Sequence, residues 1–175
     1  MIGVVAATSI VLQVIGSIVI RQFDAQLTGV RANSAAVRLS VTQEPALGNE
    51  PVLVVEYPEP SANPAARDVQ CLAEHTDWSS SRAIAFQVKS EQASRMSVSF
   101  LDRNHVVYTA YADLKGGEWQ AVQIAFDSIK PNRFFQPPDA KTGSPIDVSD
   151  VKFIAFAPQD KVSGRLMVTS FRLLQ

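Results

Sequence analysis

The sequence has little of the chemistry that most enzymes and nucleic-acid-binding proteins use. Its single cysteine excludes an intramolecular disulfide. Sixteen basic and seventeen acidic residues give a net charge of −1, and no run of Lys or Arg occurs, which argues against a nucleic-acid partner. The motifs of nucleophile elbows, phosphate-binding loops, dinucleotide-binding folds, zinc proteases and CxxC redox sites are all missing. These absences argue against an enzyme and predict no cofactor.

Few side chains remain as candidates for catalysis or metal binding. Cys71 lies close to the apolar residues Val69 and Leu72, which indicates a small buried hydrophobic residue in preference to a reactive thiol. His75 lies between Glu74 and Asp77, a pattern faintly like a metal or acid–base cluster, but spacing carries no rule in a loop. The only other histidine, His105, follows a tight turn and is expected in solvent. We therefore predict neither a catalytic residue nor a metal ligand.

Alternation of apolar and polar residues is the dominant pattern. In Met96–Phe100 and again in Val122–Phe126, every second residue is apolar, which is the period of a β-strand with one buried face. No segment indicates a confident helix, and the long loop Asp127–Val148 contains four prolines. We predict an all-β protein, a jelly-roll β-sandwich of about ten antiparallel strands. The expected strands are 18–23, 37–41, 52–57, 69–73, 83–89, 95–101, 106–112, 119–126, 151–157 and 165–174.

The N-terminal segment 2–20 carries no charge and approaches the length of about 20 residues that spans a bilayer. A secretory signal fits the apolar core but lacks a preceding basic residue and a clean cleavage site. A membrane anchor fits the length, although Gln, Thr and Ser make it weakly hydrophobic. The third alternative is a strand at Ile18–Phe23. We divide the chain into an apolar leader, 1–17, and a binding domain, 18–175. We expect a secreted, periplasmic or membrane-anchored protein, with an intracellular location as the alternative.

Two motifs in the second half carry a family resemblance. The first is Gly117-Glu118-Trp119-Gln120-x-Val122-x-Ile124-x-Phe126, followed by a loop that contains prolines. The second is the segment Asp150–Ile154, with Gly164 before the closing strand. Together they make the stretch 81–174 resemble the galactose-binding-like jelly rolls. The group in question joins the complex I intermediate-associated protein domain with the family-eleven carbohydrate-binding modules.

The resemblance implies a non-catalytic domain whose function takes one of two forms. Such a domain binds a polysaccharide or oligosaccharide on its concave sheet face, or it docks onto a protein partner during the assembly of a larger complex. Many members have an Asp-Asp pair on the last strand, linked to a structural calcium. This sequence has Thr169-Ser170 there, and neutral hydroxyls are weak calcium ligands, so we predict no metal. It also has Ala125 where the family pattern has proline.

A sugar site needs aromatic faces and fixed polar groups, and these guide the choice of candidate residues. On strand 106–112 either Tyr108 or Tyr111 faces out, and Tyr111 is our choice. We expect Phe134 and Phe135 to point in opposite directions, or else both to close the end of the sandwich, and Trp78 and Trp119 to pack in the core. An ordinary solvated sheet face is the alternative to a binding site. The candidate ligand-binding residues are Gln87, Arg95, Ser97, Tyr111, Gln123, Arg133 and Phe134.

Overall fold

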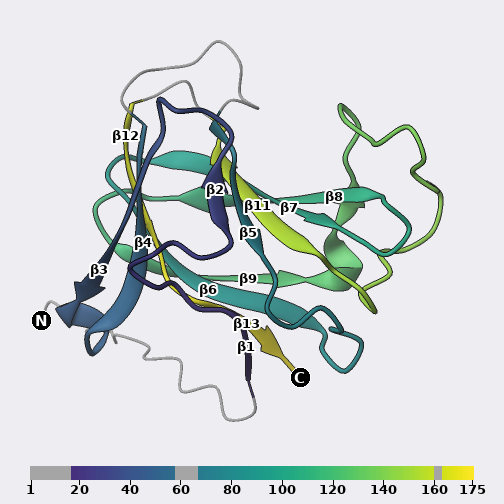
Figure 1. Cartoon of the computed structure of the whole chain (residues 1–175), viewed down its shortest axis with the longest axis horizontal. Helices are drawn as coiled ribbons and strands as arrows, with labels where there is room; N and C mark the ends of the chain where they lie inside the picture. The colour runs from purple at the N-terminus through teal and green to yellow at the C-terminus, as the bar shows by residue number, and fades with distance from the viewer. Residues whose placement is uncertain (1–16, 58–66, 160–162) are drawn as a thin grey trace, which may run out of the picture.

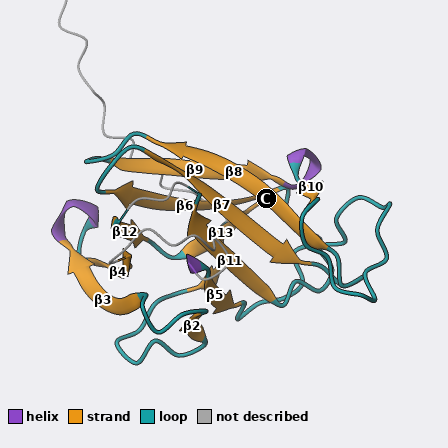
Figure 2. Ribbon diagram, turned by 90° about the horizontal axis from the view of Figure 1, so that it is seen from above, coloured by secondary structure: helices purple, strands orange, loops and turns teal. Residues whose placement is uncertain are grey.

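The computed structural model describes residues 17–57, 67–159 and 163–175, and these form two antiparallel β-sheets (Figure 1). Most of the predicted leader, residues 1–16, lies outside the described residues, so the division at residue 17 stays a prediction. In the described part of the chain, no helix is long and apolar enough to cross a bilayer. Seen from above, the regular structure consists of strands with a few short helical turns (Figure 2).

Sheet A is built around β6. On one side β6 pairs with β9, and on the other it pairs with β12 and β13, which in turn pair with β4 and β1. β3 forms the far edge through β4. The strands of sheet A are β1 (Ile18–Arg21), β3 (Arg38–Glu44), β4 (Glu50–Tyr57), β6 (Ala83–Ser90), β9 (Trp119–Ala125), β12 (Gly164–Val168) and β13 (Phe171–Leu174).

Sheet B has the order β10-β8-β7-β11-β5-β2, so β7 and β11 lie in its middle. Short helical turns occur between strands at Pro45–Leu47 and Phe126–Ser128. The strands of sheet B are β2 (Val30–Ala32), β5 (Val69–Leu72), β7 (Ser94–Leu101), β8 (Val107–Leu114), β10 (Lys130–Pro131) and β11 (Phe153–Pro158). The jelly-roll sandwich expected from the alternating pattern is therefore confirmed.

The inward faces of the two sheets form one hydrophobic core. Trp78 stands in its middle, fully buried, and donates a hydrogen bond from Nε1 to the carbonyl oxygen of His75 at 2.7 Å. Its ring packs edge-on against Phe100, with centroids 5.9 Å apart, and stacks on Phe126 at 5.8 Å. The prediction that Trp78 packs in the core is confirmed, and Cys71 is likewise buried there as a small hydrophobic residue.

At one corner of the sandwich the turn between β6 and β7 packs against the turn between β8 and β9. Gly116 lies in the contact with a positive φ of 81°, and a Cβ atom there would come within 2.5 Å of the backbone of Gln92 and Ala93. The next residue, Gly117, donates its N–H to the carbonyl oxygen of Ser90 at 2.7 Å. Only glycine fits at position 116, because any side chain would overlap main-chain atoms.

The strand predictions need three corrections. The short strands β2 and β10 were missed, since three and two residues are too few to show a period. The single closing strand expected over 165–174 is broken at Thr169 and Ser170 into β12 and β13. At the break the Thr169 hydroxyl accepts a hydrogen bond from the Gln87 N–H at 2.8 Å, and the Thr169 N–H donates to the Gln87 carbonyl oxygen at 2.9 Å.

Candidate functional site

The structure divides the predicted site residues among three places. Arg95, Ser97 and Tyr111 lie on the outer face of sheet B, because β7 and β8 pair there. Gln87 and Gln123 lie on the outer face of sheet A, where β6 pairs with β9. Arg133 and Phe134 belong to the loop after β10. Gln87 and Gln123 therefore do not share an exposed face with Arg95 and Ser97, as a single concave-face site would require. Periodicity assigns a side chain to a face of its strand, but it does not assign the strand to a sheet.

The outer face of sheet B, which we call the sheet-B face, has small side chains in its middle. Cross-strand pairing places Ser97 opposite Ala157 and Ser99 opposite Ala155 on β7 and β11. Ser97 is on the predicted face but is almost completely buried. Its hydroxyl donates to the carbonyl oxygen of Ala157 at 3.3 Å and accepts from Gln159 Nε2 at 2.8 Å.

Longer side chains stand on both flanks of these small residues. On β8 the Tyr111 ring is 46% exposed, and the Arg95 guanidinium lies over it, 4.7 Å from the ring centroid. Arg95 also forms an ion pair with Asp113, with Nε and Oδ1 3.5 Å apart. On the opposite flank, Arg31 donates from Nε and Nη2 to Gln70 Oε1 at 3.0 and 2.6 Å. The choice of Tyr111 as the outward tyrosine is confirmed, since Tyr108 is buried.

Hydrogen bonds link the polar residues of the sheet-B face to the loop after β10. The hydroxyls of Ser99 and Thr109 lie 2.9 Å apart, and Asn132 Nδ2 donates to Thr109 Oγ1 at 2.9 Å. Asn132 Oδ1 accepts from the backbone N–H groups of Phe134 and Phe135 at 2.8 and 3.0 Å. The position of the two phenylalanines is thereby fixed relative to the hydroxyls of the face.

Both phenylalanines are in solvent, which contradicts the expectation that one points inward or that both close the sandwich end. Phe134 is 93% exposed and Phe135 is 65% exposed. Arg133 beside them is also exposed. On the sheet-B face itself, Leu72 on β5 is 58% exposed and pairs with Phe153 on β11. The adjacent exposed rings of Phe134 and Phe135 are candidates for a contact with another molecule.

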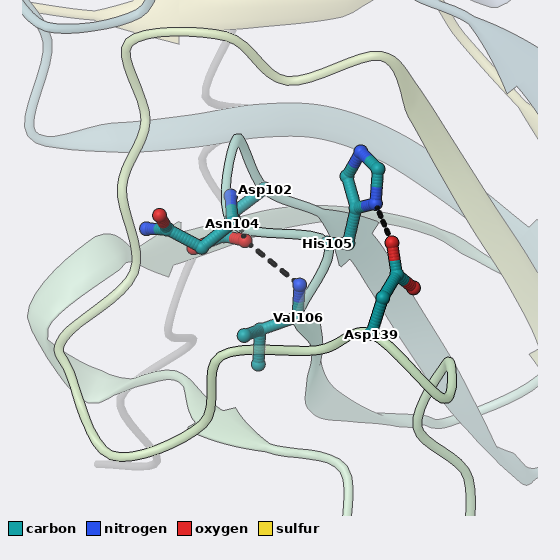
Figure 3. A network of polar contacts seen from close by, with 5 residues as sticks. All are labelled: Asp102, Asn104, His105, Val106 and Asp139. Atoms are coloured by element: carbon teal, nitrogen blue, oxygen red, sulfur yellow. Dashed lines mark hydrogen bonds and ion pairs between the residues drawn. The ribbon is translucent and has the colours of Figure 1, made fainter.

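The long loop that carries Phe134 is tied to the β7–β8 turn. Asp102 is buried, and its Oδ1 accepts from the N–H groups of Asn104 and Val106, both at 2.9 Å. Its Oδ2 accepts from the Asp147 N–H at 3.1 Å. His105 Nδ1 lies 2.6 Å from Asp139 Oδ2, and this contact lowers the pKa of the Asp139 carboxyl (Figure 3). The loop is longer than usual but is held by side-chain contacts.

A second polar surface is a groove on the outer face of sheet A, with a volume of about 190 Å³. Its small residues Ala85 and Ala121 lie on the neighbouring strands β6 and β9. Arg172 on β13 pairs with Ala85 and donates to Glu50 on β4, with Nη2 and Oε1 3.1 Å apart. The complete lining, which we call the sheet-A groove, is Glu50, Ala85, Phe86, Gln87, Ala121, Val122, Gln123, Thr169, Ser170 and Arg172.

Trp119 is also on the outer face of sheet A, opposite Lys89, and is partly buried. The expectation that it packs in the core is therefore wrong. Within the described residues, its buried Nε1 has no hydrogen-bond partner. The alternation of β9 explains the position, because Ile124 faces the core and Trp119, five residues earlier, must face outward.

Sequence reasoning missed Asp68, which lies immediately before β5. Its backbone carbonyl accepts from the Asn33 N–H at 2.9 Å, continuing the pairing of β5 with β2. Burial raises the pKa of its carboxyl to about 6. No pattern in the sequence distinguishes it from a surface aspartate. Burial also raises the pKa of the Cys71 thiol to about 12, which leaves it unreactive.

Metal binding has no candidate site in the part of the chain that the structure describes. No group of three or more His, Cys, Asp and Glu side chains is placed to hold an ion there. His75 is exposed, and the Asp77 carboxylate accepts instead from the Ser79 N–H at 3.0 Å and hydroxyl at 2.6 Å. Thr169 and Ser170 are buried, and the Thr169 hydroxyl is engaged with β6.

No protein-family model and no curated protein matches the sequence, whereas solved structures match the fold. One is a family 11 carbohydrate-binding module from Clostridium thermocellum in complex with a β-1,3-1,4-mixed-linked tetrasaccharide. It shares 18% identity at a TM-score of 0.68, covering 91% of this chain and 96% of that one. The solution structure of CtCBM11 has 17% identity and a TM-score of 0.73, with 93% and 97% covered.

A family 30 carbohydrate-binding module is also similar, with 13% identity and a TM-score of 0.64 over 92% of this chain and 99% of that one. The comparisons support the carbohydrate-binding-module side of the resemblance and give no support to the complex I intermediate-associated side. The likeness extends over nearly the whole length of both chains in each of these three comparisons. The chain therefore has the jelly-roll β-sandwich fold seen in family 11 carbohydrate-binding modules.

Proposed function

We propose that the protein is a non-catalytic carbohydrate-binding module whose sugar site is the sheet-B face. The observation that carries the proposal is the Tyr111 ring, which stands half in solvent with Arg95 over it. An aromatic face binds the C–H side of a pyranose ring, and neighbouring hydroxyls bind its oxygen atoms. Ser99, which is partly exposed on β7, supplies such a hydroxyl, and its partner Thr109 holds it in place.

The fold supports the same function. A family 11 module with this architecture is described in complex with a β-1,3-1,4-mixed-linked tetrasaccharide. An open face with one or two aromatic rings gives micromolar to millimolar affinity, about −4 to −8 kcal/mol. Such a module acts by targeting or by avidity within a larger assembly. Arg133 and Phe134 extend the site at the edge of the sheet, through the hydrogen bonds of Asn132.

A polysaccharide ligand also fits an exported or membrane-anchored protein, which is what the uncharged segment 2–20 predicts. The alternative function is a protein-assembly adaptor. The feature that favours it is the exposed pair Phe134 and Phe135, since exposed aromatic residues are common anchors at protein interfaces. In that alternative the loop, not the sheet-B face, makes the decisive contact.

The test is retention of the purified protein on immobilised mixed-linkage β-glucan, after a glycan array has identified the preferred sugar. Arg95→Ala should reduce retention without loss of folding. Arg165→Ala is the matched control, because Arg165 is also exposed and also forms a 3.5 Å ion pair, with Glu56 on the outer face of sheet A. Equal retention of the wild type and Arg95→Ala, or no binding to any glycan, would favour the adaptor function.

A further inference from the structure

The sheet-A groove is a second, separate surface with the features of a small-ligand site. Its floor is open because Ala85 and Ala121 are too small to cover the neighbouring backbone, so Phe86 and Val122 also line it. Gln123, Ala85 and Arg172 form one cross-strand row over β9, β6 and β13. The two long side chains therefore stand on either side of an alanine, two strand spacings or roughly 10 Å apart.

The polar groups of the groove are held in place or available for a ligand. Glu50 fixes the Arg172 guanidinium at 3.1 Å and neutralises its charge. In the part of the chain that the structure describes, the side-chain amides of Gln87 and Gln123 make no hydrogen bond. Ser170 is almost completely buried at the break between β12 and β13, lines the groove, and has no side-chain hydrogen bond to the described residues.

These features select a small, neutral ligand with many hydroxyl groups. Drug-sized ligands occupy pockets of roughly 300–1,000 Å³, so a groove of about 190 Å³ suits a single ring. Two amides and a hydroxyl donate and accept hydrogen bonds, which matches vicinal hydroxyls. A carboxylated or phosphorylated ligand would meet a guanidinium that Glu50 already neutralises, so it would gain little.

We propose that the sheet-A groove binds one neutral sugar residue, as a second saccharide site on the side of the sandwich opposite the sheet-B face. The inference goes beyond the proposed function, since it uses other residues and another sheet. A module with two opposed sites can bridge two glycan chains, so its avidity for a polymer exceeds the affinity of either site. The groove site alone is weak, with a Kd in the millimolar range of about −4 kcal/mol.

The experiment is an NMR titration of the ¹⁵N-labelled protein with three probes: methyl β-glucoside, methyl β-galactoside and methyl α-mannoside. The side-chain NH₂ signals of Gln87 and Gln123 and the backbone N–H of Ser170 report on the groove. We expect at least one probe to shift these signals saturably. Tyr111→Ala, which alters only the sheet-B face, should leave those shifts unchanged, so failure of the first site is distinguishable from failure of this one.

Two variants test whether the shifts arise in the groove. Ala85→Leu fills its floor and should abolish the shifts, whereas Ser40→Leu, on exposed β3 of the same outer face, should not. Gln123→Ala leaves the floor intact and should raise Kd by a factor of about 2 to 12, the value of one neutral hydrogen bond. Absence of saturable groove shifts with all three glycosides, or wild-type shifts in both Ala85→Leu and Gln123→Ala, would overturn the proposal.

Discussion

Removal of the Tyr111 ring is the sharpest test of the sheet-B face. The ring is 46% exposed, so of an aromatic surface of roughly 200 Å² about 90 Å² is free to be covered by a ligand. Complete coverage would be worth about 2.3 kcal/mol at ~25 cal/mol per Å². Arg95 already covers part of the ring, with its guanidinium 4.7 Å from the centroid, so the exposed 46% is the area that remains for a sugar. For a sugar that covers about half of this remaining area, we expect Tyr111→Ala to cost about 1.2 kcal/mol, or about an eightfold rise in Kd.

The assay is isothermal titration calorimetry with the β-1,3-1,4-linked tetrasaccharide, alongside a urea unfolding curve for each variant. Tyr111→Phe is the matched control, since it keeps the ring and removes the hydroxyl, and its Kd should stay within about twofold of the wild type. The free energy of unfolding should change little in either variant, because the side chain lies on an outer face. Wild-type affinity in Tyr111→Ala, or an equal loss in Tyr111→Phe, would refute the stacking argument.

Three further predictions concern the core and the titratable groups. Trp78→Ala should lower the free energy of unfolding by about 3–5 kcal/mol, measured in urea, because a fully buried ring is lost; a loss under about 1 kcal/mol would contradict its central place in the core. His105→Ala should raise the pKa of Asp139 toward 3.8, followed by ¹³C NMR of the carboxyl. Because the pKa of Asp139 is lower in the folded protein than in the unfolded chain, the contact stabilises the folded state at pH values above the unfolded pKa. This stabilisation is lost as the pH falls through the folded pKa. An unchanged Asp139 titration in His105→Ala would show that His105 is not the cause. Burial raises the pKa of the Asp68 carboxyl to about 6 in the folded protein. The protonated carboxyl therefore contributes to folding stability below about pH 3.8, and this contribution is lost as the pH rises through about 6. Asp68→Asn should abolish that decline in urea-unfolding stability between acid and neutral pH, and an identical pH profile in wild type and variant would exclude Asp68 as its source.

The alternation of side chains predicted most of the strands, since each of the longer strands buries one face in the common core. It could not predict which sheet a strand joins. Gln87 and Ser97 both alternate with apolar residues, yet β6 belongs to sheet A and β7 to sheet B. Sheet membership depends on long-range pairing, such as that of β6 with β9 and of β7 with β11. The alternation of apolar and polar residues along one strand does not indicate which strand pairs with it.

Individual aromatic residues were harder to place than strands. Trp78 was expected in the core and is there, because a cluster of rings surrounds it. Trp119 was expected in the core and is on an outer face, because the register of β9 decides its direction. Phe134 and Phe135 are exposed because Asn132 holds their backbone in a turn, and a hydrogen bond from a side chain to the backbone leaves no periodic signal.

The close contact of two turns at Gly116 determines where the protein can be altered by design. A side chain at position 116 would separate the β6–β7 and β8–β9 turns, which both connect sheet A to sheet B. A tag, a label or an added residue in that turn would therefore disturb the packing of the two sheets. The turn at Gly48 is different, because an added methyl group would meet no atom within 4 Å, so the positive φ of 71° favours glycine at that position without any steric overlap. A fluorophore or a fused domain attached near Gly48, at the tip of the β3–β4 turn, would leave both layers and the residues of the sheet-B face undisturbed.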